Sequence, residues 1–308
     1  MSIELLLAAA LVSGTPILLA ALGELLSERA GVLNLGVEGT MLIGAVSGFA
    51  AANVAASFWV GVLGALVAGA LFGLAFATLV VSLRLNQIVT GLAFTILGTG
   101  LSAFIGKPLI GVPPAATVPR LDLGPLADLP FFGPALFRQD VLVYAAIGLT
   151  ALIALYIRRT RPGLILRALG ESPDVVDALG LPVAALRYLY VMAGSALAGL
   201  GGAYLSLAFT PAWIENMTAG RGWIAIALVI FATWRPWWVL AGALLFGTVD
   251  ALRFRMQVGG DPIIDPHFLN MLPYLATLVV LALVSRKVLR RRLGVPAALG
   301  IAYDREHR

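Results

Sequence analysis

The sequence predicts an all-α, polytopic integral membrane protein, because its composition cannot cover a soluble surface. Of the 308 residues, 60% are hydrophobic and 12% are charged, whereas soluble domains have about 25% charged residues. Mean hydropathy is +0.96, and no charged residue occurs from Gly39 to Leu83. A soluble globule, a disordered chain and a fibrous repeat are poor fits. We therefore expect a single transmembrane domain over residues 1–308.

The expected spans follow from runs that are poor in charge and bounded by turn residues. A bilayer core of about 30 Å needs about 20 apolar residues per helix. Nine runs qualify: 3–22, 39–56, 58–82, 88–106, 140–157, 187–209, 220–235, 236–252 and 268–285. The seventh and eighth have short uncharged stretches, so they are either full helices or half-helices, and we expect about 9–10 transmembrane helices. The first run lacks the basic start and cleavage site of a signal peptide, which indicates a retained helix.

Basic residues are distributed unequally between the two sides of this threading. Most of the 21 Lys and Arg residues lie in the cytoplasm when the C-terminus is placed there, as the positive-inside rule requires. The threading gives an extracytoplasmic loop over 107–139, a cytoplasmic loop over 158–187 and a basic cytoplasmic tail over 286–308. We expect the basic residues at its start, Arg286, Lys287, Arg290, Arg291 and Arg292, to lie beside anionic lipid and to bind no nucleic acid. The aromatic residues of 233–238 suit a membrane interface.

Motifs for catalysis and nucleotide binding are absent from the sequence. The run from Gly100 to Lys107 is one residue too long for a phosphate-binding loop and is followed by Pro108 instead of a Ser or Thr that would hold Mg²⁺. No G-x-S-x-G or H-E-x-x-H motif occurs, and both histidines lie outside the expected spans. The lack of cysteine excludes a thiolate metal site. We expect no enzymatic activity, cofactor or metal site in this chain.

Two polar clusters precede apolar helices, where unpaired polar groups are costly. Residues 24–39 contain Asn34 and Glu38, and residues 213–222 contain Asn216 and Thr218. The threading places the clusters on opposite sides, and similar Gly-rich runs follow at 68–73 and 241–247. This pattern predicts an inverted repeat with a central binding site, so these four residues are candidates for a substrate path. Alternatively, the Gly-rich runs are ordinary helix-packing signals, and Asn34 and Glu38 only cap a helix.

The cytoplasmic loop contains a short helix signal over 172–180. Ser172 can cap it, Pro173 fits its first turn, Asp174 complements the dipole and Gly180 ends it. Apolar residues such as Val176 and Leu179 would have nothing to cover in water. A partner protein is therefore implied, although an amphipathic loop lying on the bilayer is the alternative.

At these segments the sequence resembles a known family. Residues 24–39, ELLSERAGVLNLGVEG, are similar to the signature of permease subunits of bacterial nucleoside-type ABC importers, within the ribose and branched-chain amino acid permease family. Residues 167–180 and the Gly-rich run 194–204 resemble that family's cytoplasmic coupling loop and following helix. The resemblance covers about residues 14–285. The Pro-rich outer loop has no clear match, which leaves the substrate open.

The resemblance implies the fold of a type II ABC importer permease and a set of partners. These are a second homologous permease, a cytoplasmic ATPase and an extracytoplasmic binding protein of the basic membrane protein type. ATP would be hydrolysed by the partner, and the substrate would be a nucleoside; a simple sugar or riboflavin would also suit the polar groups. An ion-driven secondary transporter is the rival class. The residues expected to couple to the ATPase are Arg167, Gly170, Glu171, Asp174, Val176, Leu179 and Gly180.

Overall fold

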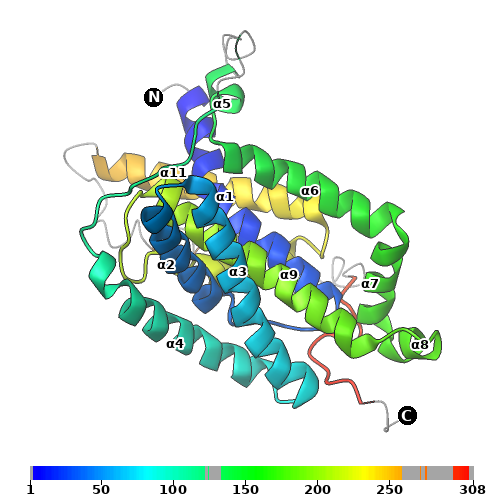
Figure 1. Cartoon of the computed structure of the whole chain (residues 1–308). Coiled ribbons are helices and arrows are strands. Elements are labelled where there is room, and N and C mark those ends of the chain that lie inside the picture. Colours follow the sequence, from blue (N-terminus) through cyan, green and yellow to red (C-terminus); the bar gives the residue numbers. More distant parts are fainter. Residues whose placement is uncertain are drawn as a thin grey trace.

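The computed structural model describes residues 3–121, 124, 133–258, 271, 275 and 294–304. Its described residues form helices and isolated β-bridges, such as that between Ile110 and Trp213 (Figure 1). Among them are seven helices long and apolar enough to cross a membrane. They are α1 (Ile3–Arg29), α2 (Val37–Ala55), α3 (Phe58–Ala77), α4 (Gln87–Gly106), α6 (Val141–Arg159), α9 (Val183–Tyr204) and α11 (Pro236–Val258). The prediction of an all-helical, multi-pass fold is confirmed.

Shorter elements connect these spans. They are the 3₁₀ turn Lys107–Leu109, α5 (Gly133–Phe137), α7 (Arg161–Glu171), α8 (Pro173–Ala178) and α10 (Arg221–Phe231). In addition, α3 and α9 each end in a π-helical turn, at Thr78–Ser82 and Leu205–Phe209.

Three of the expected span boundaries differ from the structure. Helix α1 continues to Arg29, so Glu24 and Glu28 lie in its last turns and not in a linker. Glutamate is a good helix former, and both carboxylates accept hydrogen bonds from other segments. The run 220–235 is a half-length helix, whereas the run 236–252 continues to Val258. The ninth run, 268–285, lies outside the described residues except for 271 and 275.

The helices of the two halves interlock as an inverted repeat would. Helices α1 and α9 cross where Gly23 and Gly194 face each other, and an added Cβ at either glycine would clash with the other's carbonyl oxygen. Helix α3 packs on α9 through Gly73, and α11 packs on α1 through Gly247. The Gly-rich runs make these close contacts, which confirms their role in helix packing, whereas the inverted repeat stays a prediction.

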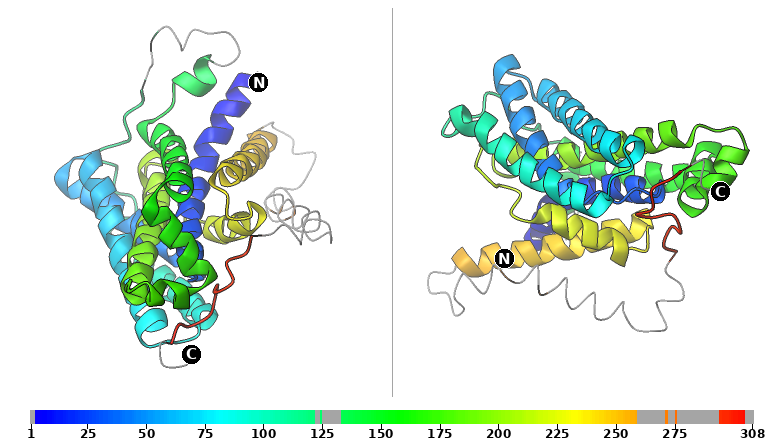
Figure 2. Two further views of the ribbon diagram at one scale, coloured as in Figure 1. Left: turned by 90° about the vertical axis from the view of Figure 1, so that its right-hand side faces the viewer. Right: turned by 90° about the horizontal axis from the view of Figure 1, so that it is seen from below.

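The end that carries α7 and α8 also carries Arg29, Arg84 and the chain segment 294–304 (Figure 2). The positive-inside rule assigns this end to the cytoplasm, and we call it the inner end. The basic residues expected beside anionic lipid, 286–292, lie outside the described residues, whereas the following segment 294–304 packs against the protein. The expectation for the aromatics is wrong for Trp234, which is buried, whereas Trp237 and Trp238 are exposed.

Candidate functional site

The half-length helix α10 is held at both ends by one segment of the first half, residues 28–38. Its eleven residues span about 16 Å at 1.5 Å per residue, about half of a 30 Å bilayer core. One end of α10 therefore lies inside the membrane. Discontinuous helices of this kind form the central sites of many transporters, where helix ends meet the substrate.

The N-terminal clamp consists of Glu38, Thr218, Gly220 and Gly222. The Glu38 carboxylate accepts hydrogen bonds from Thr218 Oγ1 at 2.7 Å and from the backbone nitrogens of Gly220 at 2.8 Å and Gly222 at 2.6 Å. Glu38 is 5% exposed and Thr218 is 0% exposed. The carboxylate thus satisfies otherwise orphaned N–H groups at the start of α10 and complements the positive end of its dipole.

Local sequence explains why this clamp can close. Gly220 precedes α10 with φ +83°, a conformation that glycine adopts without strain. A Cβ at Gly222 would lie 2.6 Å from Glu38 Cα, so only glycine permits this approach. Glu38 itself lies in the first turn of α2, and the N-termini of α2 and α10 consequently converge on one carboxylate.

The C-terminal clamp consists of Glu28, Arg29 and Trp234. Arg29 Nη2 donates to the carbonyl oxygen of Trp234 at 3.0 Å, just beyond the last turn of α10. The Trp234 indole N–H donates to Glu28 Oε2. Glu28 is fully buried, and its carboxyl group also faces that of the buried Glu24, with which it shares a side-chain hydrogen bond. A cation at this end again complements the helix dipole.

Asn34 holds the turn between the two clamps. Its backbone nitrogen donates to Glu24 Oε1 and its Oδ1 accepts from Gly36 N, both at 2.9 Å. The alternative that Asn34 caps α2 is wrong in detail, because the residue at the N-cap position is Gly36. Asn34 instead forms a local turn two residues earlier. Likewise, Glu38 does cap a helix, but that helix is α10.

The structure brings together most of the four candidates for the substrate path. Glu38 and Thr218 are hydrogen-bonded and buried, and Asn34 is buried four residues before Glu38. Asn216, in contrast, is exposed in the turn before α10, with φ +55°. The contact between Glu38 and Thr218 is observed, whereas contact of any of the four residues with a substrate stays a prediction. In the described part of the chain, no three His, Asp or Glu side chains converge in a way that would hold a metal ion.

A buried ion-pair group lies next to the N-terminal clamp, and sequence reasoning missed it. Arg221 Nη2 is 3.1 Å from Asp250 Oδ2, and Arg253 Nη2 is 2.9 Å from Asp250 Oδ1. Asp250 was placed at a span end, but α11 continues for eight residues beyond it. The sequence signal that could have revealed this group is the spacing of three residues between Asp250 and Arg253, which places both on one face of a helix. With two arginines beside it, Asp250 is already paired and is a poor candidate for an ion-coupling carboxylate.

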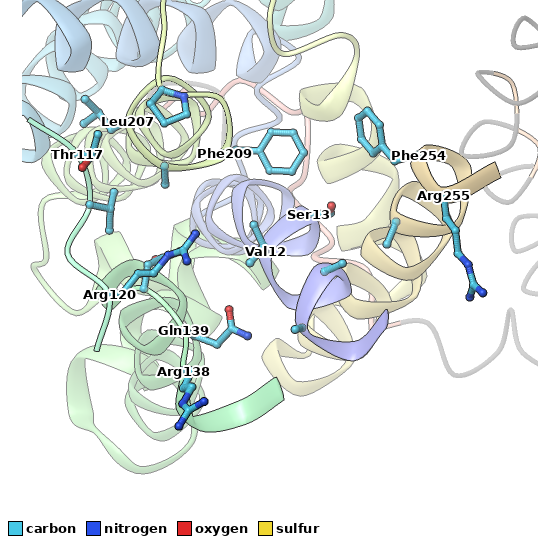
Figure 3. A pocket seen from close by; sticks show the side chains of 17 residues that line it. Val12, Ser13, Thr117, Arg120, Arg138, Gln139, Leu207, Phe209, Phe254 and Arg255 are labelled. Carbon is cyan, nitrogen blue, oxygen red and sulfur yellow. The ribbon is translucent and has the colours of Figure 1, made fainter. Parts of the chain in front are cut away.

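A large cavity lies at the outer end, away from both clamps (Figure 3). It measures about 900 Å³ and is lined by residues of α1, the end of α9 and α11, by residues 138–140 just before α6 and by residues 117–120. Arginines 120, 138 and 255 are among its lining residues, together with apolar side chains such as Phe209. None of the four candidates for the substrate path lines this cavity. It is an entrance-side feature and not the predicted central site.

The expected coupling loop is a helical hairpin, α7 and α8, at the inner end. Thr160 Oγ1 accepts from Gly163 N at 3.1 Å and starts α7, which the sequence analysis did not predict. Ser172 is at the N-cap position of α8 but makes no capping bond through its side chain, and Gly180 follows α8 with φ +76°. The hairpin is therefore longer than the expected helix.

Some side chains of this hairpin are buried against the rest of the protein, and others are exposed. The expectation that Val176 faces a partner is wrong: it is 1% exposed and packs into the core, because it points back at the bundle. Val175 and Leu179 are 54% and 72% exposed. Among the other expected coupling residues, those with exposed side chains or backbone are Arg167, Glu171, Asp174 and Gly180, whereas Gly170 is buried.

Residues 6–284 of the sequence match the protein family described as the branched-chain amino acid transport system / permease component. The chain belongs to this permease family. Relatives of this permease include a putative glucose ABC transporter permease of Haloferax volcanii, which is 41% identical over 98% of both chains. A nucleoside ABC transporter permease of Lactococcus lactis is 31% identical over 98% of this chain and 97% of that one. A guanosine ABC transporter permease of Bacillus subtilis is 32% identical over 97% and 98%.

Membership confirms the resemblance found in the sequence and fixes the general role of the molecule. The permease is a multi-pass protein of the plasma (inner) membrane and part of an ABC importer. Permeases of this family work with an ATPase and a substrate-binding protein.

Proposed function

We propose that this permease carries nucleosides and forms half of a translocation path with a second homologous permease. A separate cytoplasmic ATPase hydrolyses ATP, and an extracytoplasmic binding protein of the basic membrane protein type delivers the solute. The chain itself performs no chemistry and needs no cofactor. Two relatives named for nucleosides or guanosine, at 31% and 32% identity over almost the whole chain, support this proposal.

The observation that carries the proposal is the N-terminal clamp. The nucleoside-type motif at 24–39 supplies Glu38, which holds the membrane-buried start of α10. Helix ends at this depth present backbone groups to a substrate. Uncharged hydrogen-bonding groups around it, including Asn34, Asn216 and Thr218, suit a neutral, hydroxylated solute. All three donors to Glu38 are used within the protein, so the carboxylate shapes the path more than it binds the solute.

A hexose is the second candidate substrate. The relative from Haloferax volcanii is named as a putative glucose permease and is 41% identical, a higher identity than that of the two nucleoside relatives. A sugar shares the hydroxyl groups of a nucleoside and lacks its planar base.

The substrate is tested by uptake into proteoliposomes that contain the full complex reconstituted with its own ATPase and binding protein. Labelled guanosine, uridine and glucose are each offered with ATP and with a non-hydrolysable analogue. We expect ATP-dependent uptake of a nucleoside that excess unlabelled glucose does not reduce. Uptake of glucose alone would replace the nucleoside by a hexose. Uptake that follows an ion gradient without ATP would refute an ABC mechanism.

Coupling through α7 and α8 is tested with exposed residues. We expect Leu179→Asp and Val175→Asp to abolish uptake, because each places a charge on an apolar surface that a partner would bury. Binding of solute to the binding protein should not change. Leu164→Asp is a matched control, since Leu164 is also exposed, at 58%, but lies near the start of α7. Normal uptake by the Leu179 and Val175 variants would remove this surface from the ATPase contact.

A further inference from the structure

The chain segment 294–304, which we call the strap, crosses the inner end between α7 and the segment 28–38 (Figure 2). Ala298 N donates to the carbonyl oxygen of Gly170, near the end of α7, at 2.8 Å. Two residues later, Gly300 N donates to the carbonyl oxygen of Gly31 at 3.3 Å. The strap therefore binds the hairpin with one main-chain group and the segment 28–38 with the next.

Side chains from two further elements fasten the strap. Arg187, in the first turns of α9, is 1% exposed and donates through Nη1 to the carbonyl oxygen of Ile301 at 3.2 Å. Its guanidinium also lies 6.0 Å from the centre of the Tyr303 ring. Arg84 and Asp304 form an ion pair at 2.6 Å, but exposure makes such a pair worth little. The main-chain bonds and the buried Arg187 define the position of the strap.

The strap is continuous with the contacts that reach α10. A Cβ at Gly170 would clash with the carbonyl oxygen of Arg29 and lie 3.1 Å from Pro296 Cβ, so α7, the strap and Arg29 are in direct contact. Arg29 in turn donates to the Trp234 carbonyl, at the C-terminal clamp of α10. A cavity of about 310 Å³ separates the strap from the start of α8, which leaves room for the hairpin to shift against it.

We infer that the strap is a positioning element for transport: it carries displacement of the α7–α8 hairpin to residues 28–38 and so to α10. Coupling between distant sites requires contiguous contacts that both sites bias, and the strap supplies the contact between the hairpin and Gly31. This inference rests on the proposed coupling of the hairpin to an ATPase. Residues 294–304 thereby acquire a role in coupling, in addition to the motif residues of the hairpin itself.

Two glycines in the strap provide a matched pair of variants. Gly300 has φ +78°, and a Cβ at Gly300 or Gly294 would meet no described atom within 4 Å. Gly300→Val therefore strains the backbone turn that places the bond to Gly31, whereas Gly294→Val adds the same side chain at the far end of the strap, away from that bond.

The experiment uses the full complex in lipid nanodiscs. A single cysteine, Arg235→Cys, reports on the turn after α10 from an exposed position beside the C-terminal clamp, in a chain that has no other cysteine. We measure the rate at which a maleimide reagent labels this cysteine, with and without ATP, together with ATP hydrolysis stimulated by the binding protein. We expect Gly300→Val to reduce both the ATP-dependent labelling change and the stimulated hydrolysis by about tenfold, within the range for coupling residues. Gly294→Val should match the parent protein.

Truncation provides a second test that does not depend on turn strain. A chain ending at Leu293 lacks the strap, and a chain ending at Asp304 keeps it. We expect only the first to lose the ATP-dependent labelling change, at equal amounts of assembled complex. If assembled Gly300→Val or the chain ending at Leu293 responds to ATP like the parent, the strap has no coupling role. If the parent complex itself does not respond to ATP, the proposed function and the inference both fail.

Discussion

Each of the two clamps on α10 contains a buried glutamate, and the two glutamates differ in how completely N–H and O–H donors satisfy their carboxylates. In the N-terminal clamp, Glu38 accepts three hydrogen bonds, two of them from backbone N–H groups. In the C-terminal clamp, Glu28 accepts one hydrogen bond from the Trp234 N–H and otherwise faces a second buried carboxyl group, that of Glu24. Two carboxylates side by side repel each other, whereas a carboxylate that only accepts hydrogen bonds from N–H and O–H donors is costly only to disrupt. We therefore expect the N-terminal clamp to be the fixed joint and the C-terminal clamp to be the end that rearranges.

The residues around the two clamps also indicate that the N-terminal end of α10 is the more constrained end. Beside the N-terminal clamp lies the buried Arg221–Asp250 ion pair, which is a further constraint on the same end of α10. Beside the C-terminal clamp lie the strap and α7, whose contacts with Arg29 and Gly31 are made by backbone groups at the edge of the bundle. The end of α10 with fewer constraints is thus the end nearer to the ATPase side.

The largest loss of folding stability is expected from Glu38→Gln. The amide keeps the size of the side chain but turns an N–H₂ group towards backbone donors, so at least one buried donor loses its partner. We expect a loss of stability of about 3–5 kcal/mol, seen as little folded permease in detergent. Glu215→Gln is the control, because Glu215 is exposed in the neighbouring segment. A stable Glu38→Gln permease would show that the N-terminal clamp is not the fixed joint.

A smaller effect is expected from Trp234→Phe at the C-terminal clamp. The substitution removes the indole N–H and leaves Glu28 Oε2 without its donor, which should cost about 1–3 kcal/mol in thermal stability. Trp238→Phe, at an exposed position, should cost nothing measurable.

Combining Trp234→Phe with Thr218→Val tests whether the clamps act independently. Additive losses are expected for separated sites, and a strongly non-additive result would mean that α10 transmits strain between its ends.

Thr218→Val probes one donor of the N-terminal clamp. It removes the hydroxyl while keeping the shape of the side chain, and two backbone donors still satisfy Glu38. The expected loss is about 1 kcal/mol, and Thr218→Ser should restore most of it. A loss as large as that of Glu38→Gln would assign the clamp to the hydroxyl and not to the backbone groups.

The smallest effect on stability is expected from Asn34→Ser, since the neutral hydroxyl retains an acceptor for Gly36 N. We expect a change below about 1 kcal/mol, while uptake per assembled complex falls if the Asn34 amide meets the solute. The path role of Asn34 is abandoned if Asn34→Asp and Asn34→Ser both transport normally.

Hydropathy predicted the spans well because long charge-free runs such as 39–83 have few alternatives in a membrane. It ended α1 too early, since Glu24 and Glu28 look like linker residues until their partners Asn34 and Trp234 are known. Asn34 lies ten residues after Glu24, beyond the end of α1, and Trp234 lies 206 residues after Glu28, so no helical pattern within α1 encodes either contact. The similarity of the two polar clusters did predict that Glu38 and Thr218 lie in related places.

The orientation of side chains on α8 and the docking of the strap could not be predicted from sequence patterns. Val175 and Val176 are chemically identical neighbours, and only the packing of α8 decides which one faces outward. The strap follows a basic run and so resembled a solvated tail. Its signals were Pro296, Gly300 and Tyr303, which suit a fixed turn better than a tail, but its docking site is formed by residues more than a hundred positions away.

The crossed packing of the two halves has a consequence for biosynthesis. Gly14 on α1 fits against Ala243 on α11, and Gly23 fits against Gly194 on α9. When α1 enters the membrane, the segments that cover these glycines have not yet been made. At about 5–20 residues per second, α1 waits roughly 10–50 s for its last neighbour. During this interval its small-residue surface meets only lipid or the insertion machinery, so the nascent permease depends on that machinery longer than a protein whose consecutive helices pack together.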